Sequence, residues 1–293
     1  MTPILDASAW QDFFASFPGL WPAVAAAAGA VLASFFGVLV DRLPLAEGLR
    51  TGVPDMSVNL WTPSRCPHCG TRISALALVP VLGWLIHRGR CFRCGAKVPW
   101  AYPAMEAFSA AASAAVACRF GPCGPGLAAL SLLWGCIAIS WMDWREHWIP
   151  DGFAVPLLLA GLVASPFEAT PLMRSEALAL CAGLVWILSA AVGARRRIDA
   201  VSGGDIMLAG LAGAWLGVAL AAPFLLITAA AYVAYAVPLH LAFSRVGSAG
   251  APREDMEDVA YSGPMGPALC ASLMVCVWFG PALALPVPAW LGP

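Results

Sequence analysis

The feature that most constrains this chain is a succession of apolar stretches, most of them about as long as a lipid bilayer is thick. A bilayer core requires about 20 apolar residues of α-helix. Eight stretches meet or nearly meet this length, at about residues 18–40, 101–118, 126–142, 152–167, 175–194, 206–222, 224–243 and 264–285. Only 11% of the residues are charged, too few to cover the surface of a soluble domain. The sequence therefore predicts an all-α polytopic membrane protein with about eight transmembrane helices.

The count of eight depends on two weaker positions. The fourth stretch, 152–167, is short for a span, and the sixth and seventh stretches meet closely at Pro223. Seven helices is therefore the alternative count.

The basic residues predict the orientation. If the N-terminus lies outside the cytoplasm, 14 of the 16 Lys and Arg residues fall in inside loops, and only Arg119 and Arg174 fall outside. Cytoplasmic loops of membrane proteins carry an excess of Lys and Arg. We therefore expect both termini to face away from the cytoplasm and the long segment 41–100 to lie in it.

Segment 41–100 is the only non-membrane piece large enough to form a soluble module. The sequence thus predicts three parts: 1–40 with the first transmembrane helix, 41–100 as a cytoplasmic domain, and 101–293 as a transmembrane core. A net charge of −1 provides no basic field for nucleic acid, so the expected surroundings are the lipid bilayer and no nucleic acid is expected as a partner.

Four cysteines in the predicted cytoplasmic domain have the spacing of a metal site. They form Cys-x2-Cys-x21-Cys-x2-Cys, at Cys66, Cys69, Cys91 and Cys94, and a glycine follows each pair. Two such turns can present four thiolates to one zinc ion in a closed tetrahedral site, whose role is structural. Two disulfides or unliganded thiols are the alternatives, and the disulfides are opposed by location, because cytoplasmic thiols stay reduced. The pattern favours a small tetracysteine zinc-binding domain between the first and second helices.

Two acids lie at the predicted cytoplasmic ends of apolar helices, Asp143 in WMDWREHW and Asp205 in SGGDIMLAG. Ionisable groups at such depth are costly and often functional. Two carboxylates brought together share a proton, so that one can act as general base toward water and the other as general acid. That division of roles is what peptide hydrolysis by an aspartic dyad requires.

Structural roles are also open for these acids. Ser202 and Asp205 match a helix capping box, and Asp143 lies among tryptophans typical of a membrane interface. Asp151, which follows Pro150, is a candidate N-cap for the next helix. Glu106, early in the second span, is either a buried partner for an arginine or a functional acid.

Taken together, these segments resemble the bacterial type IV prepilin peptidases, the bifunctional leader peptidase/N-methyltransferases. The resemblance covers nearly the whole chain and rests on five segments: ASFFGVLVDRLP (33–44), the cysteine segment 63–110, IAISWMDWREHWIPDGFAVPLL (137–158), SGGDIMLAGLAGAWLG (202–217) and SGPMGPAL (262–269).

The resemblance implies an aspartyl membrane protease of the GxGD type in the bacterial inner membrane, with periplasmic termini and a cytoplasmic zinc domain. It implies that Asp143 and Asp205 cut the basic leader from type IV prepilins or type II secretion pseudopilins, and that 101–293 is the protease core. The four cysteines would bind structural zinc. The enzyme would also N-methylate the new N-terminus from S-adenosylmethionine, although segment 41–100 has no glycine-rich fingerprint for this cofactor.

Two positions depart from the family pattern. Ser202 replaces the first glycine of Gly-x-Gly-Asp, and Met207 replaces a lysine two residues after the aspartate. These departures keep two other functions open: a catalytically degenerate assembly factor of a pilus or secretion system, and a transporter that binds cations at Asp143 and Asp205.

Overall fold

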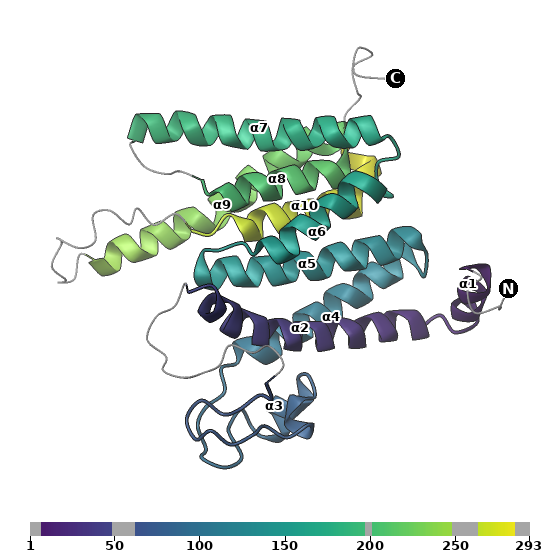
Figure 1. Cartoon of the computed structure of the whole chain (residues 1–293). Coiled ribbons are helices and arrows are strands. Elements are labelled where there is room, and N and C mark those ends of the chain that lie inside the picture. The colour runs from purple at the N-terminus through teal and green to yellow at the C-terminus, as the bar shows by residue number, and fades with distance from the viewer. Residues whose placement is uncertain (1–6, 49–61, 197–200, 248–262, 285–293) are drawn as a thin grey trace. The chain divides into compact units, whose positions relative to one another are not determined.

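A computed structural model describes residues 7–48, 62–196, 201–247 and 263–284 of the chain. Within these ranges every regular element is a helix, and β-pairing is limited to two isolated bridges in the cysteine segment. The chain forms two compact units, residues 1–138 and 139–293. Helix α5 (Gly124–Glu146) contributes residues to both (Figure 1).

The first unit is built on two long helices, α2 (Leu20–Ala46) and α4 (Ala101–Phe120), which pack against each other. Small residues allow the close approach, because a Cβ at Gly29 would lie 2.2 Å from the Ser113 hydroxyl. The Ser109 hydroxyl donates to the Gly29 carbonyl at 2.7 Å, as expected where membrane helices meet through small and polar residues. A short helix, α1 (Ala7–Ser16), precedes α2 and was not predicted from the sequence.

Residues 62–100 lie between α2 and α4 and are called here the cysteine module. It contains two turns that carry the cysteine pairs, the 3-10 helix η2 (Leu76–Leu78) and the short helix α3 (Leu82–Ile86). The module continues directly into α4 (Figure 1), and the N-cap of that helix is Trp100.

The second unit has α8 (Gly203–Leu216) at its centre. This helix packs against α6 (Asp151–Ala164), α7 (Pro171–Arg196) and α10 (Gly266–Leu283), and all its residues from Leu208 to Leu216 are buried. Its glycines permit close contact, since a Cβ at Gly213 would lie 2.3 Å from the Ala177 carbonyl oxygen of α7.

Arg174, in the first turn of α7, is buried and serves as a cap for neighbouring backbone. Its guanidinium donates hydrogen bonds of 2.6–3.4 Å to five carbonyl oxygens, those of Leu162, Val163, Ser165, Glu168 and Ala169. Carbonyl groups at the end of α6 and in the loop after it are thereby satisfied without water.

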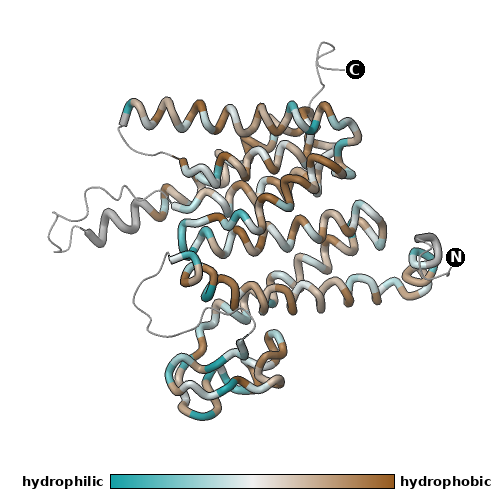
Figure 2. Tube along the Cα trace, in the orientation of Figure 1, coloured by the Kyte–Doolittle hydropathy of each residue, from teal (hydrophilic) through white to brown (hydrophobic). Residues whose placement is uncertain are grey.

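Helices occupy all eight predicted stretches, but eight transmembrane spans are not confirmed. Among the described residues, four helices are long and apolar enough to cross a membrane: α2, α5, α7 and α9 (Val218–Gly247). Helices α6, α8 and α10 are apolar but shorter, and α4, with Glu106 and two serines, is not among the four. Figure 2 shows the predominantly apolar colouring of the helices and the more polar cysteine module.

Two expected helix boundaries were wrong. The break between the sixth and seventh stretches falls at Gly217, which has φ +72°, while Pro223 lies inside α9. Glycine adopts this left-handed conformation without steric strain, so it ends α8 more readily than a proline does. The N-cap of α6 is Pro150, and Asp151 occupies the first turn, where its charge suits the helix dipole.

Candidate functional site

Asp205 is held at the start of α8 by the predicted capping box. The Ser202 hydroxyl accepts a hydrogen bond from the Asp205 backbone N–H at 3.2 Å, and Asp205 Oδ2 accepts from the Ser202 N–H at 3.1 Å. The Ser202 hydroxyl also lies 2.8 Å from Oδ2. Only 7% of Asp205 is exposed, and its Oδ1 is buried without a hydrogen-bond partner among the described residues. Such an oxygen is a place for a water molecule or a substrate group.

Asp143 lies in the last turn of α5 and is also buried, with 5% exposed. Its Oδ2 accepts a hydrogen bond of 2.8 Å from the backbone N–H of Gly266, the first residue of α10. A Cβ at position 266 would lie 2.6 Å from the same oxygen. The contact therefore requires glycine, and it brings the SGPMGPAL segment to the carboxylate.

The second unit brings the two aspartates close enough for their charges to interact, and Asp143 also interacts electrostatically with His147. Gly204 lets the first turn of α8 lie close to Ile149, which is six residues after Asp143. A Cβ at position 204 would lie 3.1 Å from the Ile149 side chain. Each carboxylate uses Oδ2 for a protein hydrogen bond, and Oδ1 of Asp205 stays open. Two neighbouring carboxylates in an apolar setting can hold a single proton and divide acid and base roles.

Two tyrosines of α9 complete the surroundings of the aspartates and were missed in the sequence. The Tyr235 hydroxyl donates to the Pro264 carbonyl, and its ring lies 6.1 Å from Trp144 and 5.5 Å from Tyr232. Both tyrosines are within electrostatic range of Asp205. The available signal was their scarcity: the chain has four tyrosines, and two of them lie three residues apart on this apolar helix.

The four predicted cysteine ligands come together in the cysteine module. Their sulfur atoms all lie within 4.8 Å of one another, with Cys66 Sγ 3.7 Å from Cys94 Sγ and Cys69 Sγ 4.0 Å from Cys91 Sγ. Four sulfurs about 2.3 Å from one zinc ion at tetrahedral angles would be roughly 3.8 Å apart. The donor set and its spacing therefore fit zinc, whereas all four thiols are free rather than paired in the alternative disulfides.

The two cysteine turns are built alike. In each turn the first cysteine donates its N–H to the carbonyl five residues later, in Thr71 or Ala96, and the glycine four residues later donates back to that cysteine. Those glycines, Gly70 and Gly95, have φ +67° and +71°. The geometry of each pair thus depends on residues close together in the sequence.

Hydrogen bonding favours the thiolate form at two of these cysteines. Bonds from the Thr71 side chain and backbone lower the pKa of the Cys69 thiol to about 6, and the backbone N–H groups of Cys94 and Arg93 lower the pKa of Cys91. At Cys94, the backbone N–H of Ala96 favours the thiolate. Desolvation and the adjoining sulfurs outweigh it and raise the pKa of Cys94 to about 11. A bound cation would allow all four to be thiolates together.

Glu106 of α4 pairs with backbone rather than with an arginine. Its Oε2 accepts a hydrogen bond of 2.6 Å from the backbone N–H of Val81, the residue before α3. Val81 has φ +62°, a strained conformation for a β-branched residue. Glu106 thus fastens the start of α3 to α4.

Comparison with known proteins identifies the family. Residues 27–120 match the bacterial peptidase A24 N-terminal domain, and residues 130–237 match the type IV leader peptidase family. A prepilin leader peptidase/N-methyltransferase of Burkholderia pseudomallei is 36% identical over 222 residues, 70% of this chain and 72% of the relative. The chain belongs to the type IV leader peptidase family. It is therefore a peptidase, and its apolar helices agree with the inner-membrane location expected of this family.

Two further relatives of the family give the same picture. The Aeromonas hydrophila prepilin leader peptidase/N-methyltransferase is 34% identical, over 64% of this chain and 70% of its own length. A type 4 prepilin-like proteins leader peptide-processing enzyme of Escherichia coli is 30% identical, over 70% and 81%. No solved structure matches the chain.

The Ser202 departure has a structural explanation within this leader peptidase. Serine is a strong N-cap residue, and its hydroxyl satisfies the first turn of α8 while bonding Asp205. The second departure, Met207, leaves no cation at that position of α8, and nothing in the structure explains the choice of methionine.

Proposed function

We propose that this chain cleaves the basic leader of type IV prepilins or type II secretion pseudopilins, with Asp143 and Asp205 as the catalytic pair. The observation that carries the proposal is the convergence of two buried carboxylates from α5 and α8 in a leader peptidase. Asp143 Oδ2 is held by the backbone N–H of Gly266 in α10, and Asp205 Oδ2 is held by Ser202 in its own helix cap. Fixed groups of this kind need little reorganisation during the reaction.

The hydrolysis follows from the shared proton. A water at the open Oδ1 of Asp205 would lose a proton to the ionised member of the pair as its oxygen attacks the scissile carbonyl carbon. The protonated member would give its proton to the carbonyl oxygen. When the C–N bond breaks, the pair gives its proton to the leaving nitrogen and takes one from a hydroxyl of the tetrahedral intermediate, which collapses to the carboxyl product. The pair then again holds a single proton.

The orientation that we propose places this site at the cytoplasmic membrane face, with both termini in the periplasm and the cysteine module in the cytoplasm. Asp143 and Asp205 are at the ends of their helices that lie near arginines in the sequence, with Arg145 in the last turn of α5 and Arg195 and Arg196 at the end of α7, before α8. A basic leader would stay in the cytoplasm while the apolar helix that follows it enters the bilayer. The scissile bond would then lie at the level of the pair.

We further propose that Cys66, Cys69, Cys91 and Cys94 hold a structural zinc ion, which would link the two cysteine turns. N-methylation of the new N-terminus from S-adenosylmethionine is also proposed. Its support is the name shared by the relatives of Burkholderia pseudomallei and Aeromonas hydrophila. No residue of this chain is assigned to that cofactor.

The test is a cleavage assay on purified full-length protein with a prepilin substrate. We expect the wild type to remove the leader and both Asp143→Asn and Asp205→Asn to be inactive. Asp151→Asn is the matched control, since Asp151 is an exposed acid in the first turn of α6. Persistent cleavage by both dyad variants would refute the catalytic pair.

The same assay separates the two rival functions. A wild-type protein that cuts none of several prepilins and pseudopilins would favour the degenerate assembly factor or the cation-binding transporter. Labelled S-adenosylmethionine in the same reaction tests methylation, which should appear only on the cleaved product because the leader covers the amine beforehand.

A further inference from the structure

The cysteine module exposes an apolar surface that the fold of the described residues does not cover. Four side chains of η2 and α3 define what we call the apolar face: Leu76, Leu82, Leu85 and Ile86, which are 58%, 56%, 55% and 55% exposed. Trp100, at the junction with α4, is 74% exposed. Single exposed leucines are ordinary, but a group of them on adjacent elements marks an interaction surface.

The packing of α3 shows that this exposure is built into the fold. Gly83 faces inward, where a Cβ would lie 2.3 Å from the Ala77 carbonyl oxygen of η2, and Trp84 donates from Nε1 to the Val98 carbonyl at 3.1 Å. Leu82, Leu85 and Ile86 are spaced i, i+3 and i+4, and therefore share the opposite side of the helix. The inward side is fully used, so the apolar face points away from the module.

The charge of the module indicates the kind of partner. Residues 62–100 contain six basic side chains and no acidic one: Arg65, Arg72, Arg88, Arg90, Arg93 and Lys97. A zinc ion on four thiolates would add a charge of −2 and leave the module strongly positive. A positively charged surface with an apolar face is typical of segments that lie in the headgroup region of anionic membranes.

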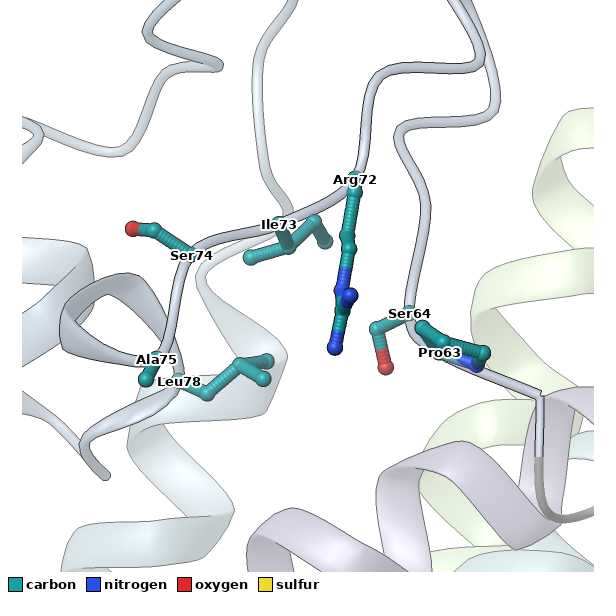
Figure 3. Close-up of a pocket in the computed structure, with 7 residues that line it drawn as sticks. All are labelled: Pro63, Ser64, Arg72, Ile73, Ser74, Ala75 and Leu78. Carbon is teal, nitrogen blue, oxygen red and sulfur yellow. The ribbon is translucent and has the colours of Figure 1, made fainter.

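A pocket next to η2 also combines a positive charge with apolar side chains. It has a volume of about 490 Å³, and its lining includes Ser64, Arg72 and Leu78. Figure 3 shows the Arg72 side chain extending between Pro63 and Ser64 on one side and Leu78 on the other. An arginine beside hydroxyl and apolar groups suits the phosphate of a lipid headgroup.

The attachment of the module to α4 sets its height relative to the bilayer. Trp100 directly precedes α4, and the hydrogen bond from Val81 N–H to Glu106 holds the start of α3 against the second turn of that helix. Helix α4 packs along α2, which is long and apolar enough to span a membrane. The apolar face is thus kept at the start of α4, beside a helix that is long enough to span a membrane, so that it would lie at the level of the lipid headgroups.

We infer that the cysteine module docks on the anionic lipid surface through its apolar face, with its basic side chains against the headgroups. This inference does not depend on the proposed peptidase mechanism. Like charges disfavour the two protein alternatives, because a basic leader and a second copy of this module would both be repelled.

Site-specific photocrosslinking of the full-length protein in lipid nanodiscs tests the inference. The photoreactive residue p-benzoylphenylalanine replaces Leu85 in one protein and His68, exposed in the first cysteine turn, in the control. Mass spectrometry identifies the adducts in phosphatidylcholine alone and in phosphatidylcholine with phosphatidylglycerol. We expect lipid adducts from position 85 at about threefold or more the yield from position 68, with a further rise when the anionic lipid is present.

A second pair of variants separates the apolar and electrostatic contributions. In proteins that carry the position 85 probe, Ile86→Ser should lower lipid adducts in both lipid mixtures, whereas Arg88→Gln with Arg93→Gln should remove only the rise caused by phosphatidylglycerol. Bound zinc per chain checks that the module stays folded. Adducts to residues 139–293, to a second copy or to another protein would overturn the inference, as would equal lipid yields at positions 85 and 68.

Discussion

The aspartate pair and the cysteine module reach a defined geometry in opposite ways. Each cysteine turn is closed by hydrogen bonds among residues at most five apart, and its glycine supplies the required positive φ. The aspartate pair draws on three separate segments, around Asp143, Ser202–Asp205 and Pro264–Gly266. One site is encoded locally, and the proposed zinc ion would join its two halves. The other is encoded by helix packing and is complete only when the second unit is folded.

The largest expected effect is the loss of either carboxylate. Asp205→Asn or Asp143→Asn should lower the prepilin cleavage rate by about 10³-fold or more, because the amide can neither share the proton nor act as a base. Zinc content should not change, since the cysteine module lies in the other unit. Cleavage rates and zinc per chain, measured on the same preparation, check both expectations.

Removing a thiol should lower the zinc content, which the aspartate variants are expected to keep. Cys66→Ser should release the metal and expose residues 62–100 to limited proteolysis, since a structural zinc site contributes folding free energy to a small module. Cys118→Ser, outside the cluster, is the matched control and should keep its zinc. A Cys66→Ser protein with wild-type zinc content and protease resistance would contradict the tetrathiolate site.

A smaller effect is expected where α10 contacts the aspartate. Gly266→Ala places a methyl group 2.6 Å from Asp143 Oδ2, so the carboxylate must move from its N–H donor. We expect a loss of cleavage of about 10–100-fold in kcat, in the range seen when a catalytic group is misplaced. Gly152→Ala adds the same methyl group at a helical position with open space and should cleave normally. Equal activity of the two variants would show that the contact is not needed.

Tyr235→Phe should have a milder consequence. The variant keeps the ring contact with Trp144 but loses the hydroxyl that holds the Pro264 carbonyl. One hydrogen bond contributes about 1 kcal/mol, so cleavage should fall only several-fold. The fall should appear in kcat at unchanged KM, since the hydroxyl fixes a segment that positions Asp143. A rise in KM alone would instead assign Tyr235 to substrate binding.

The smallest effect is expected at the family departure. Ser202→Gly restores the glycine of the family pattern and loses only the cap hydroxyl, which costs a few tenths of a kcal/mol when glycine replaces serine. Cleavage should stay within about twofold of wild type. Ser202→Ala, which is a poor cap, should cost about 1 kcal/mol of stability. A strong gain of activity in Ser202→Gly would show that serine restrains the enzyme.

The contrast between the two sites explains what sequence reasoning could reach. The cysteine spacing predicted the cluster, and the capping box at Ser202 could be recognised in the sequence. Both depend on residues that are close together in the chain. The partner of Asp143 was not readable, since Gly266 lies 123 residues away and contributes only a backbone N–H. Glu106 was recognised as unusual, but its partner is also a backbone N–H, that of Val81, which leaves no side-chain pattern to find.

Helix boundaries failed for a related reason. Pro223 was expected to separate two helices, yet proline is tolerated inside apolar helices and α9 continues through it. The break instead required a left-handed residue, which Gly217 supplies. Hydropathy located the helices well, but the number that cross the membrane depends on packing that hydropathy does not record.

The buried cap formed by Arg174 changes how many positive charges would reach solvent on the outer side in the proposed orientation. By position Arg174 is one of two basic residues assigned to the outside loops. Its guanidinium donates hydrogen bonds to five backbone carbonyls, and the residue is 6% exposed. Arg119 is then the one basic residue of those loops whose charge reaches solvent. In the orientation that we propose, the folded α6–α7 turn would bury one of the two positive charges on the outer side, so that fewer positive charges there reach solvent than the sequence suggests.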